Sequence, residues 1–116
     1  MRDLTYVSDT AEGFICAAVA EGVDGEVLNL GYGKGITIGD LAKLLMQVTG
    51  VEVPIQSEAQ RVRPEKSEVR ELISDNSKAA ERIAWRPQVS LEEGLRRTVD
   101  FIRQHPEEFR PQEYGV

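Results

Sequence analysis

The chain has 116 residues, a formal net charge of −6 at pH 7 and a single cysteine. Its length allows one ordinary domain with a single core. The acidic balance argues against nucleic acid as the main partner, because binding a phosphate backbone requires a broad basic face. No apolar run approaches the ~20 residues of a membrane span, and the N-terminus lacks the apolar stretch of a signal peptide. One cysteine permits no internal disulfide, so we expect a reducing, cytoplasmic setting.

The first residues predict a strand followed by a helix. Residues 3–7 are rich in β-branched and aromatic side chains and predict a short strand. Asp9 comes three residues before Glu12, which resembles a capping box and predicts a helix over roughly 10–21. Cys16 lies on this apolar helix, and we expect it to be a core or near-core thiol.

A second strand and helix follow. Residues 26–30 (EVLNL) predict a strand, and residues 31–35 (GYGKG) match neither of the glycine-rich phosphate-binding patterns. We interpret the glycines as a tight turn that requires positive φ. Thr37 predicts the N-cap of a helix through about Val48, and Gly50 predicts its end.

The next elements are shorter. Residues 51–55 predict an edge strand because they contain a proline, and residues 71–75 predict another short strand. Asp75 or Ser77 is expected to cap a helix that ends near Trp85, a residue that we interpret as a packing anchor. The prediction for Asp75 is a cap rather than a catalytic carboxylate.

The last helix has the clearest start. Ser90 and Glu93 form a capping box ahead of an apolar stripe. Residues 1–105 are therefore expected to form the folded unit, and residues 106–116 a polar tail. The whole pattern predicts a mixed α/β (α+β) subdomain with short strands, about four helices and no complete Rossmann fold.

No candidate catalytic or metal centre emerges from the side chains. His105 is the only histidine, and it lies at a helix end, where a cation complements the helix dipole. The sequence contains no Cys/His cluster with metal-ligand spacing and no serine–histidine–acid set. We therefore predict neither a catalytic residue nor a metal ligand in this chain.

The stretch QRVRPEKSEVREL, residues 60–72, concentrates positive charge in an acidic chain. It has two interpretations. Its cations can form a solvated surface that neighbouring glutamates neutralise, or its arginines can clamp a doubly charged anion such as a diphosphate. The arginine fork binds phosphate oxygens bidentately, which makes the clamp chemically reasonable. The cations of this stretch are Arg61, Arg63, Lys66 and Arg70.

Four motifs, taken in order, resemble the C-terminal third of extended short-chain dehydrogenase/reductases, the NAD-dependent sugar-nucleotide epimerases and dehydratases. They are RDLTYVSD at 2–9, EVLNLGYGKGITIGDLA at 26–42, RVRPEKSEVRELISDNSKA at 61–79 and AWRPQVSLEEGLRRTVDFI at 84–102. The RPEKSEV stretch and the ending EYGV look most like the 4,6-dehydratases. The resemblance favours the clamp interpretation of the arginines.

The resemblance also implies specific residues. By matching motif positions, Arg2 and Arg63, with Arg61 as the alternative, approach the diphosphate of the substrate. Asn29 lines the nucleotide pocket, and Asp9 resembles a structural helix cap. The expected ligand is a UDP-, GDP- or dTDP-sugar.

Two parts that such enzymes carry are missing from this sequence. It has no G-x-x-G-x-x-G fingerprint for the NAD pyrophosphate and no Y-x-x-x-K catalytic pair. We therefore expect a substrate-recognition portion that binds no cofactor and is inactive alone, although NAD serves the parent family. Its partner is then either the missing Rossmann domain or a second copy, and the alternative function is a stand-alone self-associating interaction module.

Overall fold

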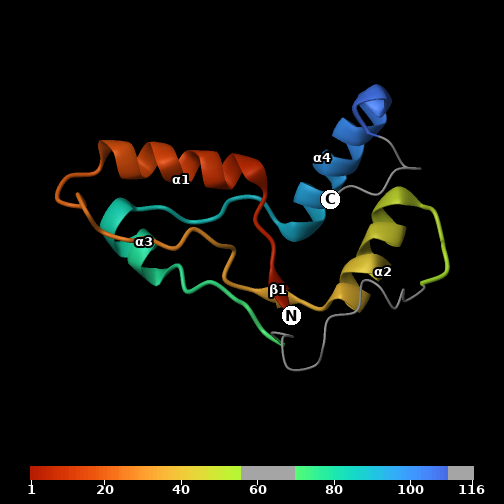
Figure 1. Cartoon of the computed structure of the whole chain (residues 1–116), viewed down its shortest axis with the longest axis horizontal. Helices are drawn as coiled ribbons and strands as arrows, with labels where there is room; N and C mark the ends of the chain where they lie inside the picture. The colour runs from red at the N-terminus through yellow and green to blue at the C-terminus, as the bar shows by residue number, and fades with distance from the viewer. Residues whose placement is uncertain (56–69, 110–116) are drawn as a thin grey trace.

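The computed structural model describes residues 1–55 and 70–109. Within these ranges the chain forms four α-helices, one 3₁₀ helix and a two-stranded sheet. Helices α1 and α3 lie together on one side of the molecule and α2 and α4 on the other, with β1 between the two pairs (Figure 1). The predicted mixed α/β class with short strands and about four helices is confirmed.

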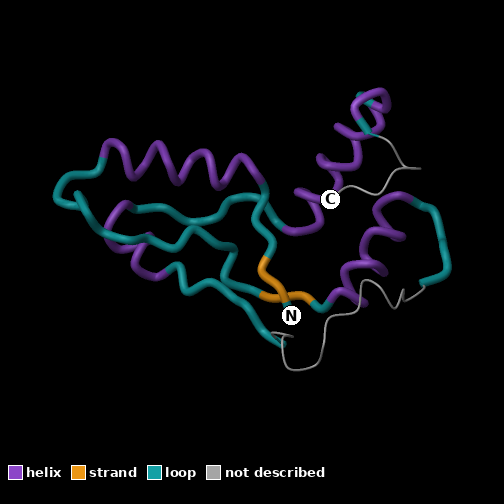
Figure 2. Tube along the Cα trace, viewed as in Figure 1, coloured by secondary structure: helices purple, strands orange, loops and turns teal. Residues whose placement is uncertain are grey.

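The small sheet lies at the N-terminus (Figure 2). Strands β1 (Arg2–Asp3) and β2 (Gly35–Ile36) run antiparallel, with Arg2 opposite Ile36 and Asp3 opposite Gly35. A parallel bridge also joins Arg2 to Leu72, and the Asp3 N–H donates to the Leu72 carbonyl at 3.1 Å. Strand β1 is therefore the junction of three segments that lie far apart in the sequence.

The predicted strands are wrong in extent. The strand expected over 3–7 is limited to Arg2–Asp3, and 71–75 contributes a single bridge. Residues 26–30 and 51–55 form no strand. A strand exists through hydrogen bonds to a neighbour, and β-prone residues favour an extended segment without supplying that neighbour.

The core lies between α1 (Val7–Val19) and α3 (Ser77–Ile83). Trp85, 1% exposed, is its largest member, and Cys16 packs against it while remaining partly exposed. The predictions of a packing anchor at Trp85 and a near-core thiol at Cys16 are therefore confirmed. The core cluster of buried side chains among the described residues is Val23, Ala79, Ile83 and Trp85.

The prediction that Asp9 caps a helix is wrong. Helix α1 begins at Val7, so Asp9 lies in its first turn and is only 4% exposed. Its Oδ1 accepts the N–H of Gln88 and its Oδ2 the N–H of Val89, both at 3.0 Å. The Asp9 carbonyl accepts the Trp85 Nε1–H at 2.8 Å. Asp9 thus joins α1 to the segment that leads into the last helix.

Helix α2 (Ile38–Thr49) has both of its predicted ends. The Thr37 Oγ1 accepts the N–H of Asp40 at 3.0 Å, which satisfies a donor that the first turn leaves unpaired. Gly50 has a φ of 72° and donates its N–H to the Met46 carbonyl at 2.9 Å. A left-handed residue after the last turn is the expected stop.

Helix α4 (Leu91–Gln104) packs against α2. The Ser90 Oγ accepts the Glu93 N–H at 3.2 Å, as predicted. The second half of the predicted capping box is replaced, because the Glu93 carboxylate accepts a hydrogen bond from the Arg97 Nε at 3.0 Å. The cap is thus formed by the serine side chain.

The chain leaves α4 through His105, its C-cap, into a 3₁₀ turn, η3 (Pro106–Glu108). The His105 ring stacks on Phe101 with centroids 4.3 Å apart, and Phe109 meets Phe101 edge-on. These contacts place His105 in an aromatic cluster at the helix end. None of the described helices is long and apolar enough to cross a membrane.

Candidate functional site

A cavity of about 610 Å³ lies where β1, the segment 28–31 and the segment 72–75 meet. It contains the two predicted site residues that fall within the described ranges, Arg2 and Asn29. The described ionisable side chains that line it are Arg2, Asp3 and Asp75.

The other two predicted residues, Arg61 and Arg63, lie outside the described residues. Arg2, which lies in β1, and Asn29, which lies in the segment 28–31, both line this cavity. The Arg2 Nη1 donates to the Met1 carbonyl at 3.0 Å. Its guanidinium has five N–H donors in a fork that matches phosphate and carboxylate oxygens.

Asp3 organises the cavity. Its Oδ1 accepts the Tyr32 N–H at 2.9 Å, and its Oδ2 accepts the N–H groups of Gly33 at 2.8 Å and Ser74 at 3.0 Å. Two amides of the GYGKG loop are thus bound by the chain's own carboxylate. Gly33 has a φ of 84°, so the interpretation of this loop as a glycine-dependent turn is confirmed.

Two segments, 28–31 and 72–75, form the two walls of the cavity, and they touch at Gly31. A Cβ atom at Gly31 would lie 2.1 Å from the Ser74 Cβ and 3.1 Å from the Asp3 Oδ2. The Asn76 Nδ2 donates to the Gly31 carbonyl at 2.9 Å. The Ser74 hydroxyl is buried and makes no hydrogen bond within the described part of the chain. Only glycine fits at this contact.

Asp75 carries negative charge at the edge of the cavity. A hydrogen bond from the Ser77 hydroxyl at 2.6 Å, followed by one from the Ser77 N–H at 3.0 Å, lowers the pKa of Asp75 below its ordinary value of 3.8. The carboxylate is therefore ionised at neutral pH. The prediction that Asp75 or Ser77 caps α3 is wrong, because the N-cap is Asn76, which makes no side-chain cap hydrogen bond, and Ser77 is the first residue of the helix.

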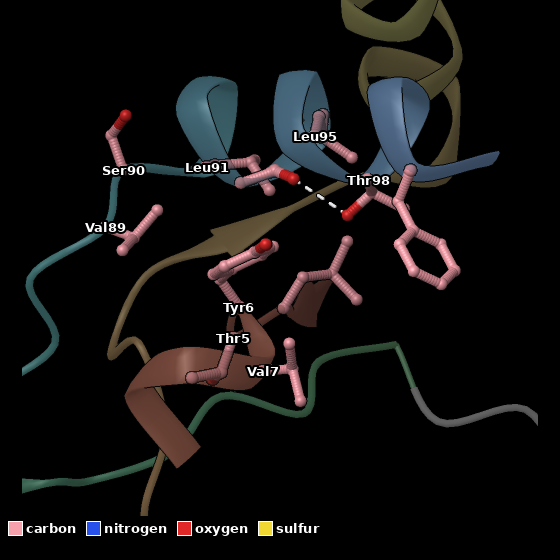
Figure 3. A pocket seen from close by; sticks show the side chains of 11 residues that line it. Thr5, Tyr6, Val7, Val89, Ser90, Leu91, Leu95 and Thr98 are labelled. Atoms are coloured by element: carbon pink, nitrogen blue, oxygen red, sulfur yellow. Dashed lines mark hydrogen bonds between the residues drawn. The ribbon is translucent and has the colours of Figure 1, made fainter. Parts of the chain in front are cut away.

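A second cavity, of about 500 Å³, lies between the residues before α1 and helix α4 (Figure 3). Figure 3 shows Tyr6 and Val7 facing Leu95 and Thr98 across it. The Thr98 hydroxyl donates to the Gly94 carbonyl of its own helix at 2.8 Å. The lining is mainly apolar, so this cavity offers little to a charged ligand.

Asp3, Gly31 and Ser74 also belong to the site, although they were not predicted from the sequence. The sequence contained an indication for Asp3, because this residue directly follows the predicted site residue Arg2 in the RDLTYVSD motif. The sequence contained no such indication for Gly31 and Ser74, because their role depends on a contact between two segments that lie far apart in the chain.

Comparisons with known proteins show which enzyme family this chain resembles. A family model described as GDP-mannose 4,6 dehydratase matches residues 1–98. The UDP-glucuronate 4-epimerase of Thermodesulfobacterium geofontis is 34% identical over 107 residues, which cover 91% of this chain and 31% of that protein.

Solved structures agree. The UDP-glucose 4-epimerase of Thermotoga maritima, solved with UDP-glucose, matches with a TM-score of 0.76 and 39% identity over 90% of this chain and 32% of its own. The Bordetella bronchiseptica enzyme WbmF, solved with NAD⁺ and UDP, matches with a TM-score of 0.75 and 26% identity over 92% of this chain and 31% of its own. This chain therefore spans about a third of the length of these relatives.

The glycine loop differs from a dinucleotide-binding loop in sequence and in the partners of its amides. The sequence lacks the glycine fingerprint, and the N–H groups of Tyr32 and Gly33 in its glycine loop already bind Asp3. The similarity instead covers the C-terminal part of the structural relatives. The chain belongs to the GDP-mannose 4,6 dehydratase family, within the NAD-dependent sugar-nucleotide epimerases and dehydratases of the extended short-chain dehydrogenase/reductase class.

Proposed function

We propose that this chain recognises the nucleoside diphosphate of a nucleotide sugar, as the substrate-binding portion of an NAD-dependent epimerase or dehydratase. The observation that carries the proposal is the cavity that has both Arg2 and Asn29 in its lining. Relatives of this family have been solved with UDP-glucose and with UDP, which makes a uridine diphosphate the first ligand to test.

Each residue has a distinct role in this proposal. Arg2 binds diphosphate oxygens and Asn29 contacts the nucleoside. Arg61 and Arg63, which lie outside the described residues, complete the clamp. A hydrogen bond to a charged group contributes about 1.5–3 kcal/mol when water is excluded. An exposed ion pair contributes only ~0–1 kcal/mol. Affinity therefore depends on how well the cavity shields the diphosphate.

The proposed contribution of this chain is recognition alone. The family chemistry requires a bound NAD and a tyrosine–lysine pair, and the sequence contains neither the fingerprint nor the pair. We expect the purified chain with added NAD to leave UDP-, GDP- and dTDP-sugars unchanged. Conversion of any of them would contradict this part of the proposal.

A two-dimensional amide NMR titration with UDP-, GDP- and dTDP-sugars tests the binding. We expect saturable shifts at Asn29 and around Arg2, strongest for one base. Arg2→Gln should weaken that binding by about tenfold, because it removes one charge-assisted contact. Arg96→Gln is the matched control, since Arg96 pairs with Glu92 on the exposed face of α4. Flat spectra at millimolar ligand would overturn the proposal.

A second candidate is a module that self-associates through α1. Four apolar side chains of α1, Val7, Phe14, Ile15 and Val19, are between 58% and 75% exposed. An apolar face of this kind tends to recruit a partner, and the candidate occupant is the same face of a second copy. Sedimentation equilibrium of the wild-type chain and of Phe14→Lys tests it. A dimer that Phe14→Lys dissociates supports the module, and a monomer at all concentrations rejects it.

A further inference from the structure

We propose that Asp3 is a positioning residue for nucleotide recognition. Its carboxylate holds the two walls of the Arg2–Asn29 cavity in the geometry that binds a nucleoside diphosphate. This inference rests on the proposed function, and it concerns a side chain that would not itself touch the ligand.

The hydrogen bonds of Asp3 reach both walls. The N–H groups of Tyr32 and Gly33 follow the wall 28–31, and the N–H of Ser74 belongs to the wall 72–75. Asp3 itself directly follows Arg2 in β1. One carboxylate therefore sets the relative positions of the strand that carries Arg2, the wall that carries Asn29 and the opposite wall.

The close contact between the two walls leaves little room for either wall to move. Gly31 and Ser74 are packed closely enough that no Cβ fits at Gly31, and Asn76 ties the Gly31 carbonyl to the start of α3. A shift of either wall therefore moves the other. Removing the charge of Asp3 weakens three charge-assisted hydrogen bonds together, so we expect the walls to separate where they meet.

An anion next to a diphosphate site requires an explanation. A bare carboxylate would repel a phosphate, but the charge of Asp3 is directed into three backbone N–H groups. Arg2 provides positive charge from the neighbouring position. Asp3 is thus arranged for a structural task at the site, in contrast to a general acid or base, which must face the reacting atoms.

Asp9 provides a matched control. It also binds backbone N–H groups with both carboxylate oxygens, but it lies beside Trp85 in the core. Asp9→Asn should lower the thermal stability of the chain and leave the UDP affinity of the folded fraction unchanged. Asp3→Asn should weaken UDP binding by about tenfold, because the separated walls no longer hold Arg2 and Asn29 in the binding geometry.

The test measures UDP dissociation constants by amide NMR titration of the wild-type chain, Asp3→Asn and Asp9→Asn at a temperature where each is folded by circular dichroism. A second variant, Asp3→Glu, keeps the charge but moves the carboxylate by one methylene, and it should bind UDP with intermediate affinity. It also serves if Asp3→Asn does not fold. Hydrogen exchange at Tyr32, Gly33 and Ser74 should accelerate in both Asp3 variants before any ligand is added.

The outcomes separate the two levels of inference. If the wild-type chain binds neither UDP nor any of the UDP-, GDP- and dTDP-sugars, the proposed function fails and this inference fails with it. If the wild-type chain binds and both Asp3 variants bind equally well, only the positioning role is overturned. Equal losses of affinity in the Asp3 and Asp9 variants would also overturn it, because they would reflect general destabilisation.

Discussion

Asp3 and Asp9 belong to the same short motif and use the same chemistry in two different settings. Each carboxylate accepts N–H groups from segments that come much later in the chain. Asp9 is almost completely buried beside Trp85, whereas Asp3 is partly exposed at the edge of a cavity. Burial, and not hydrogen bonding alone, decides whether such a carboxylate contributes mainly to stability or mainly to the shape of a site.

The physical reason is the cost of leaving a polar group without partners. Removing a hydrogen bond from a buried group costs its full desolvation energy, whereas water can replace a lost partner at a partly exposed group. The region around Asp9 should therefore respond to mutation through the free energy of unfolding. The region around Asp3 should respond first through local geometry.

The largest effect is expected from Trp85→Ala, which breaks the Asp9 region. It removes the largest buried side chain among the described residues and the donor to the Asp9 carbonyl. We expect a loss of about 3–5 kcal/mol in the free energy of unfolding, measured by urea denaturation followed by circular dichroism. Trp85→Phe keeps most of the apolar contacts and should cost clearly less. Equal losses in the two variants would show that the hydrogen bond to Asp9, and not packing, dominates.

The next effect is expected in the Asp3 region, from Gly31→Ala. The new methyl group would collide with Ser74, because no Cβ fits between the walls. We expect about 1–3 kcal/mol of destabilisation, typical of overpacking, together with weaker nucleotide binding.

Gly39→Ala is the matched control for Gly31→Ala. Its Cβ would meet no atom within 4 Å, and Gly39 lies in α2. Replacing a helical glycine by alanine should stabilise the chain by about 0.5–1 kcal/mol. Chemical denaturation of both variants gives the comparison, and a neutral Gly31→Ala would disprove the close contact between the walls.

A smaller effect is expected from Ser90→Ala, which sharpens the description of the Asp9 region. Ser90 caps α4 and directly follows Val89, whose N–H binds Asp9. Loss of the cap should cost about 1 kcal/mol and shift the amide resonance of Val89. Thr37→Ala removes the equivalent cap of α2 and should leave the Val89 resonance in place. A shift in both variants would mean that the two helices transmit the change to each other.

The smallest effect is expected from Asp75→Asn, next to the Asp3 region. The pKa of Asp75 is lowered by its hydrogen bonds from Ser77, so its contribution to stability is complete above its unfolded pKa and is lost as the pH falls through the lower folded pKa. The difference in melting temperature between the wild-type chain and Asp75→Asn should be constant from about pH 5 to pH 7 and vanish in acid. A difference that grows as the pH falls would have the wrong sign.

The two ends of α2 and the start of α4 were predicted correctly from the sequence. Thr37, Ser90 and Gly50 act where they were expected to act, because a cap involves residues only three or four positions apart. Trp85 was also correctly predicted as an anchor. In the candidate site, sequence motifs pointed to Arg2 and Asn29, which line one cavity, while their roles there remain predictions.

Features that depend on distant segments were decided by the tertiary structure. The extent of each strand depended on the segment with which it pairs. Strand β1 pairs with Gly35–Ile36 and forms a single bridge with Leu72. Asp9 had the local spacing of a cap, but its carboxylate binds the N–H groups of Gln88 and Val89 instead. A side chain satisfies whichever donors the folded chain brings to it, and spacing along the sequence cannot show which distant donors those will be.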